Sequence, residues 1–139
     1  MRILEENTLS NALNLESLDL SNNKLKSISL KSDNNFRRLS TLNIASNSLS
    51  VMDESWRSGY PTLRLLNVSH NRIGPVIFKR DLQFVKEYNG MTLDISFNKV
   101  QIVRIDKTVR SKKKNFQTIY LDLKGNFGIS RNENKFLYI

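Results

Sequence analysis

Residues 15–25 read LESLDLSNNKL, residues 39–49 read LSTLNIASNSL and residues 63–73 read LRLLNVSHNRI. When each stretch is numbered from 1 to 11, all three carry apolar residues at positions 1, 4, 6 and 11 and asparagine at position 9. Two looser copies, GMTLDISFNKV at 90–100 and TIYLDLKGNFG at 118–128, keep the apolar positions 4 and 6 and the asparagine. Unrelated short strands would not repeat one pattern in register in this way, so internal repetition decides the fold.

The asparagines set the period of the repeat, with successive spacings of 24, 24, 27 and 28 residues. They are Asn23, Asn47, Asn71, Asn98 and Asn126. Units of about 20–29 residues with the pattern L-x-x-L-x-L-x-x-N-x-L resemble leucine-rich repeats. The resemblance implies an α/β solenoid over residues 1–139, a single array of about five coils whose parallel sheet lines the concave side of a curved stack.

The residue types of each repeat have a physical explanation. Side chains alternate along a strand, so positions 4 and 6 point into the coil while positions 3, 5 and 7 point outward. The asparagine amide is predicted to bind backbone groups that the following turn leaves unpaired. Apolar residues of the return segments, including Phe36, Val51, Met52 and Val76, are predicted to fill the convex side, and Lys79–Tyr88 to form a short helix.

Both ends of the array depart from the repeat. Residues 1–14 read as the tail of a truncated repeat, with Leu9 and Ala12 preceding the next strand. The fifth copy runs on to Lys135–Ile139 without a polar or disulfide-bonded cap. A solenoid normally closes its ends with atypical repeats, so we expect both ends of the strand row to be open and the chain to be a fragment of a longer array.

Composition argues against catalysis and metal binding. The chain has no cysteine and one histidine, which excludes thiolate nucleophiles, cysteine zinc sites and centres with several histidines. Ser69 and His70 are adjacent, but a nucleophile and base also need a third group that orients the base, and the sequence supplies none. We therefore expect no enzyme activity, no metal and no cofactor.

The outward positions of the strands form a candidate ligand-binding concave face. Asp94 and Asp122 stand at position 5, Phe97 at position 8 and Tyr120 at position 3. Exposed aromatics among polar neighbours are typical of energetic contacts in protein interfaces, and the two carboxylates would favour a basic partner. The alternative is that these residues are ordinary surface polar groups that any solenoid requires.

Two further features suggest surface chemistry. Asn67-Val68-Ser69 is an N-x-S triplet, so Asn67 is a possible glycosylation site if the chain enters a secretory route. The second feature is a basic loop within the last inter-repeat spacing. Its cations are Lys107, Arg110, Lys112, Lys113 and Lys114. The net charge of +9 favours nonspecific attraction of anions, but no nucleic-acid docking motif accompanies it, so no specific nucleic-acid partner is expected.

The irregular repeats carry a more specific resemblance. WRSGYPTL at 56–63, LNVSHN at 66–71, DLQFV at 81–85 and TLDISFN at 92–98 resemble the extracellular domain of insect Toll receptors, in the Toll-like receptor family. That resemblance implies a membrane glycoprotein receptor in innate-immune or developmental signalling. Its array would bind a cystine-knot cytokine of the Spätzle type, or a second receptor copy, outside the plasma membrane. The chain differs from the family in lacking cysteine-bounded caps, a signal peptide, a membrane span and a signalling domain, so an intracellular scaffold that binds other proteins in the cytoplasm is the alternative.

Overall fold

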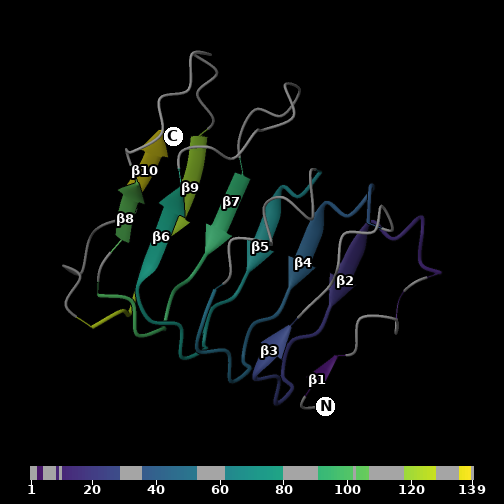
Figure 1. The fold of residues 1–139 in the computed structure, drawn as a ribbon, viewed down its shortest axis with the longest axis horizontal. Coiled ribbons are helices and arrows are strands. Elements are labelled where there is room, and N and C mark those ends of the chain that lie inside the picture. Colours follow the sequence, from purple (N-terminus) through teal and green to yellow (C-terminus); the bar gives the residue numbers. More distant parts are fainter. Residues whose placement is uncertain are drawn as a thin grey trace.

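The computed structural model describes residues 3–4, 9, 11–28, 36–52, 62–79, 91–101, 103–106, 118–127 and 135–138. Within these ranges the chain forms short strands arranged as a curved stack of coils, with the two termini at opposite ends of the stack (Figure 1). The strands are β1 (Ile3–Leu4), β2 (Ser17–Asp19), β3 (Ser27–Ile28), β4 (Thr41–Asn43), β5 (Leu65–Asn67), β6 (Val76–Lys79), β7 (Met91–Asp94), β8 (Val103–Asp106), β9 (Thr118–Asp122) and β10 (Lys135–Tyr138).

The main sheet contains one strand from each repeat. Its order is β10-β9-β7-β5-β4-β2, and β2, β4, β5, β7 and β9 are all parallel. Position 4 of each repeat pairs with position 4 of the next, from Leu18 and Leu42 through Leu66 and Leu93 to Leu121. We call the repeats with β2, β4, β5, β7 and β9 coils 1 to 5. This register confirms the leucine-rich repeat solenoid.

Two short parallel pairs, β1–β3 and β6–β8, form on the return segments (Figure 1). Ile3 pairs with Ser27, one repeat later, so β1 occupies the place of a return strand before coil 1. The amide of Leu15 donates to the carbonyl of Ala12, as that of Leu39 donates to Phe36. Residues before coil 1 thus follow the geometry of the segment before coil 2.

A continuous apolar core lies between the main sheet and the return segments. The inward repeat positions supply most of it, with Leu25, Leu39, Leu93, Ile95 and Val100 fully buried. Phe36 and Val76 are buried and Met52 packs against the core, as the sequence predicts. The prediction for Val51 is wrong, because this side chain is 74% exposed.

The end of the sheet beside coil 5 differs from expectation. β10 pairs antiparallel with β9, with Lys135 opposite Leu121 and Tyr138 opposite Thr118. The expectation of an open strand edge is therefore wrong at β9, because the chain reverses and supplies its own neighbouring strand. The described residues contain no helix, and Lys79 ends strand β6, while the rest of the helix predicted over Lys79–Tyr88 lies outside them.

Candidate recognition surface

The repeat asparagines form a ladder of side chains along the turns that follow the strands. In coil 3, the Nδ2 of Asn71 donates to the carbonyls of Val68 and Ser69, at 3.0 and 3.1 Å. The same nitrogen lies 3.0 Å from the carbonyl of Ile44 in coil 2, while Oδ1 accepts a 2.9 Å hydrogen bond from the Leu49 amide. One buried amide therefore closes its own turn and joins it to the preceding coil.

This connection recurs at every step of the stack. The bonds run from the Leu25 amide to Asn47 Oδ1, from Leu49 to Asn71, from Ile73 to Asn98 and from Val100 to Asn126, each at 2.9 Å. Asn71, Asn98 and Asn126 are buried, and the Nδ2 of Asn23 donates to the Leu20 and Ser21 carbonyls of its own coil. Because buried amides without partners are costly, the ladder stabilises the stack.

Position 5 carries a second ladder with a different role. In every coil its side-chain Oδ1 accepts a hydrogen bond from the amide two residues later, at 2.8–3.2 Å. These residues are Asp19, Asn43, Asn67, Asp94 and Asp122. Such local bonds are typical of aspartate and asparagine at turns. Asp94 and Asp122, predicted as ligand contacts, thus each use one oxygen to cap the strand-end turn.

The Asp19 carboxylate in coil 1 has a lowered pKa. Hydrogen bonds from the side chain and the backbone of Ser21 lower its pKa below the ordinary value of 3.8, and the Asn43 amide contributes in the same direction. The Asn43 Nδ2 donates to Asp19 Oδ2 at 3.1 Å, which links coils 1 and 2 on the concave face. This carboxylate therefore stays ionised in mild acid.

Position 8 has an uncommon backbone conformation in all five coils. Its residues have φ between 51° and 72°, in the left-handed region. They are Asn22, Ser46, His70, Phe97 and Gly125. Glycine and asparagine tolerate this conformation, whereas a bulky side chain such as phenylalanine rarely adopts it. Coils 3 and 4 therefore hold large rings at positions that the backbone does not favour.

The two rings support each other. His70 and Phe97 stack with centroids 4.4 Å apart and an interplanar angle of 11°. On its other side the Phe97 ring lies over Gly125, where an added Cβ would sit 2.5 Å from Cδ1 of the ring. The Lys124 Nζ lies 5.9 Å from the ring centroid. The ring is confined between coils 3 and 5, yet remains 42% exposed.

Two further apolar side chains lie on the same side of the sheet. Leu65 and Tyr120 occupy position 3, in register with Thr92 between them, and are 38% and 44% exposed. Coils 1 and 2 carry Ser17 and Thr41 at this position. We call the set Leu65, His70, Phe97 and Tyr120 the aromatic patch. At positions 3 and 8, the large apolar and aromatic side chains therefore lie in coils 3 to 5.

Other predicted features are placed as follows. Asn67 is half-buried on β5, with its Oδ1 on the Ser69 amide at 3.0 Å. Ser69 is buried and His70 exposed, and both follow the strand rather than lying within it. The basic loop, from Lys107 to Lys114, lies outside the described residues. In the described part, no three acidic or histidine side chains gather as metal ligands, and no helix has the length and hydropathy to cross a membrane.

Two local features at the strand ends were not predicted from the sequence: the capping side chain at position 5 and the left-handed backbone at position 8. The capping role of position 5 is readable from Asp or Asn placed two residues before the turn. The left-handed position 8 is signalled by Asn22 and Gly125, but His70 and Phe97 hide the pattern in coils 3 and 4. The stacking of these two rings follows from register, which the unequal repeat lengths obscure in the sequence.

Comparison with known families agrees with the geometry. Residues 13–73 match the family model described as Leucine rich repeat. No curated protein and no solved structure matches the chain. Arrays of this kind are typically non-catalytic modules for protein interaction. The repeat register, the asparagine ladder and the family match together show that the chain folds as a leucine-rich repeat solenoid.

Proposed function

We propose that this leucine-rich repeat protein binds a protein partner through the aromatic patch on coils 3 to 5. The observation that carries the proposal is Phe97, a large ring in the left-handed region that remains 42% exposed. Strained backbone of this kind costs about 1–3 kcal/mol and is concentrated at functional sites. Asn22 and Gly125 show that the same turn can be built at lower cost.

The arrangement of the patch suits a preorganised contact. The Phe97 ring is held by His70 and has no room on the Gly125 side, so little side-chain freedom remains to be lost on binding. Tyr120 adds a second exposed ring on the neighbouring coil. Asp94 and Asp122 pair at position 5 of the same two coils, between the positions that carry the rings. Their carboxylates favour a partner that presents basic residues beside an apolar surface.

The finer proposal concerns the setting. The resemblance of the irregular repeats to insect Toll receptors supports an extracellular ligand-binding or dimerisation domain on the plasma membrane. Its partner would be a cystine-knot cytokine of the Spätzle type or a second receptor copy. The absence of cysteine supports the alternative of a cytoplasmic scaffold, since secreted proteins use disulfides freely.

The binding test compares exposed aromatics on and off the concave face. Binding of candidate cytokines is measured by titration calorimetry with the parent chain and with Phe97→Ala, Tyr120→Ala and Phe127→Ala. Phe127 is 78% exposed and follows the Asn126 turn, so it serves as a matched control. We expect the first two changes to weaken binding by about tenfold or more and the third to leave it unchanged. Equal affinity in all variants would contradict the assignment of the patch.

Glycosylation of Asn67 tests whether the chain is extracellular or cytoplasmic. In cells that make the protein, a glycan removable by glycosidase and absent from Asn67→Gln indicates a secretory route. An unglycosylated protein in the cytosolic fraction favours the scaffold. This experiment separates the receptor proposal from the binding proposal, because the aromatic patch serves either setting.

A further inference from the structure

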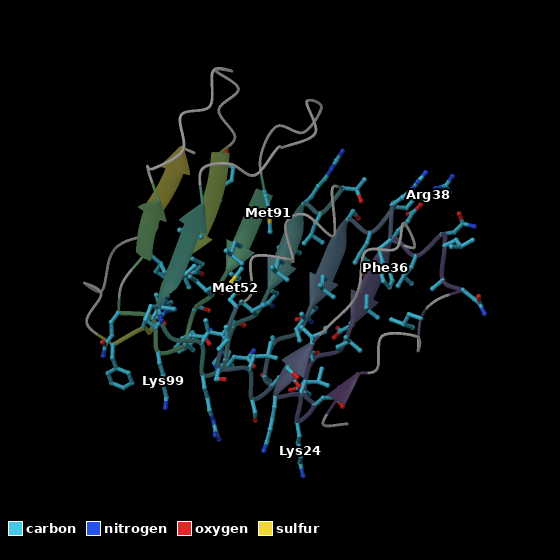
Figure 2. All side chains as sticks on the ribbon, viewed as in Figure 1. Lys24, Phe36, Arg38, Met52, Met91 and Lys99 are labelled. Carbon is cyan, nitrogen blue, oxygen red and sulfur yellow. The ribbon has the colours of Figure 1, made fainter. Side chains whose placement is uncertain are left out.

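A row of residues along the side of the stack where the strands end is not used by the proposed function. These residues directly follow the asparagines of the ladder and occupy position 10 of the five coils. They are Lys24, Ser48, Arg72, Lys99 and Phe127, and we call them the exit edge. The cations and Phe127 are exposed, and Figure 2 shows Lys24 and Lys99 extending away from the sheet on the same side of the stack.

The backbone fixes the row in register. The amide of Ser48 donates to the carbonyl of Leu25 at 2.8 Å, and the amides of Arg72 and Lys99 repeat this bond to the preceding coil at 2.8 and 2.9 Å. Successive residues of the exit edge are therefore one coil apart, which is about 4.8 Å between parallel strands. Arg72 and Lys99 are adjacent in this row, and such like charges repel each other unless an anion lies between them.

The segments that carry the exit edge contain no acidic residue to offset its positive charge. Residues 24–28, 48–52, 72–76 and 99–101 follow the asparagine ladder and contain Lys24, Lys26, Arg72 and Lys99 but no carboxylate. The carboxylates at position 5 of the same coils cap the strand-end turns with Oδ1. Within these described segments, the exit edge is thus a cationic strip without a carboxylate of its own.

We propose that the exit edge binds an extended acidic peptide that carries an apolar residue at one end. The strip from Lys24 to Phe127 covers four coil steps, about 19 Å, which is the length of about six extended residues. Carboxylates of the peptide face the three cations, and the apolar residue packs against Phe127 in coil 5. The exposed ring favours a peptide over a sulfated glycan or a phosphate backbone, neither of which offers an apolar side chain.

The test measures fluorescence anisotropy of a labelled seven-residue peptide with alternating glutamate and serine and a terminal leucine. The full chain is compared with the double variant Arg72→Glu/Lys99→Glu. Arg37→Glu/Arg38→Glu is the charge-matched control, because both residues are exposed and Figure 2 shows Arg38 on the opposite side of the stack from Lys24 and Lys99. We expect about a tenfold or greater loss of affinity for the first pair and less than about a twofold change for the control.

A second pair of measurements separates the peptide from other anions. Phe127→Ala is expected to weaken the leucine peptide severalfold and to leave a peptide with serine in place of leucine unchanged. Circular dichroism verifies that each variant is folded. The proposal is overturned if the peptide does not bind, if both charge pairs weaken it equally, or if Phe127→Ala affects neither peptide. It is also overturned if a sulfated oligosaccharide binds more tightly than the leucine peptide.

Discussion

Coil 1 carries Asn22 at position 8 and coil 4 carries Phe97, yet the two residues have φ values of 55° and 51°. The turns therefore have one backbone conformation with two very different side chains. In coils 1 and 2 positions 3 and 8 are polar, whereas in coils 3 to 5 they include the aromatic patch. The comparison shows that inward positions, the asparagine ladder and the capping residues at position 5 recur in every coil, while positions 3 and 8 differ between coils and can carry recognition.

The largest expected effect tests whether the core is uniform along the stack. Leu93 in coil 4 is fully buried, and Leu93→Ala is expected to lower the free energy of unfolding by about 2–5 kcal/mol. Leu18 holds the same position in coil 1 but is only partly buried, so Leu18→Ala should cost less than half as much. Urea denaturation followed by circular dichroism measures both. Equal losses would show that coil 1 is packed as tightly as coil 4.

The asparagine ladder gives the next largest effect. Asn71→Ala removes a buried amide that joins coils 2 and 3 and should lower the free energy of unfolding by about 2–3 kcal/mol. Asn67→Ala removes a local hydrogen bond, from the Ser69 amide within the turn of coil 3, and should cost less than about 1 kcal/mol. The same denaturation experiment decides, and an equal cost at the two sites would contradict the role of the ladder between coils.

Gly125→Ala tests the confinement of the Phe97 ring. The new methyl group would meet the ring and the residue would remain in the left-handed region, so a loss of about 1–2 kcal/mol is expected. In a Phe97→Ala background the collision disappears and only the backbone cost remains. A double-mutant cycle measures this coupling, and strictly additive losses would show that the ring yields without strain.

A smaller effect is expected when coil 4 is given the residue of coil 1. Phe97→Asn relieves the left-handed backbone but removes the stack on His70, two contributions of about 1 kcal/mol each and opposite sign. The free energy of unfolding should therefore change by less than about 1 kcal/mol while partner binding falls. A large destabilisation would mean that the ring is a structural element of the fold.

The smallest effect concerns acid. The pKa of Asp19 is lowered in the folded chain, so its contribution to stability is fully present above the ordinary pKa of 3.8 and is lost as pH falls through the lowered pKa. Asp19→Asn should lower the stability of the folded chain slightly at neutral pH and match the parent chain below the lowered pKa, so that the pH dependence in this acid range becomes flatter. Unfolding midpoints between about pH 2 and 6 test this. A parallel shift at every pH would contradict the assignment.

The sequence predicted the fold through residues whose role is repeated. Leu42, Leu66 and Leu93 mark the buried strand position because apolar side chains recur at one spacing and must share one core. The contact between His70 and Phe97 was not predictable, since it depends on how coils of unequal length are brought into register. The reversal at β10 was missed because a short apolar run does not indicate strand direction.

The hydrogen bonds of the ladder give the chain a temporal order during synthesis. The turn of coil 1 binds Oδ1 of Asn47, which belongs to the repeat made 24 residues later. At about 5–20 residues per second, a ribosome needs roughly one to five seconds to deliver that partner. The backbone amide at position 11 of each newly made coil therefore gains its asparagine partner only after the next repeat has been synthesised.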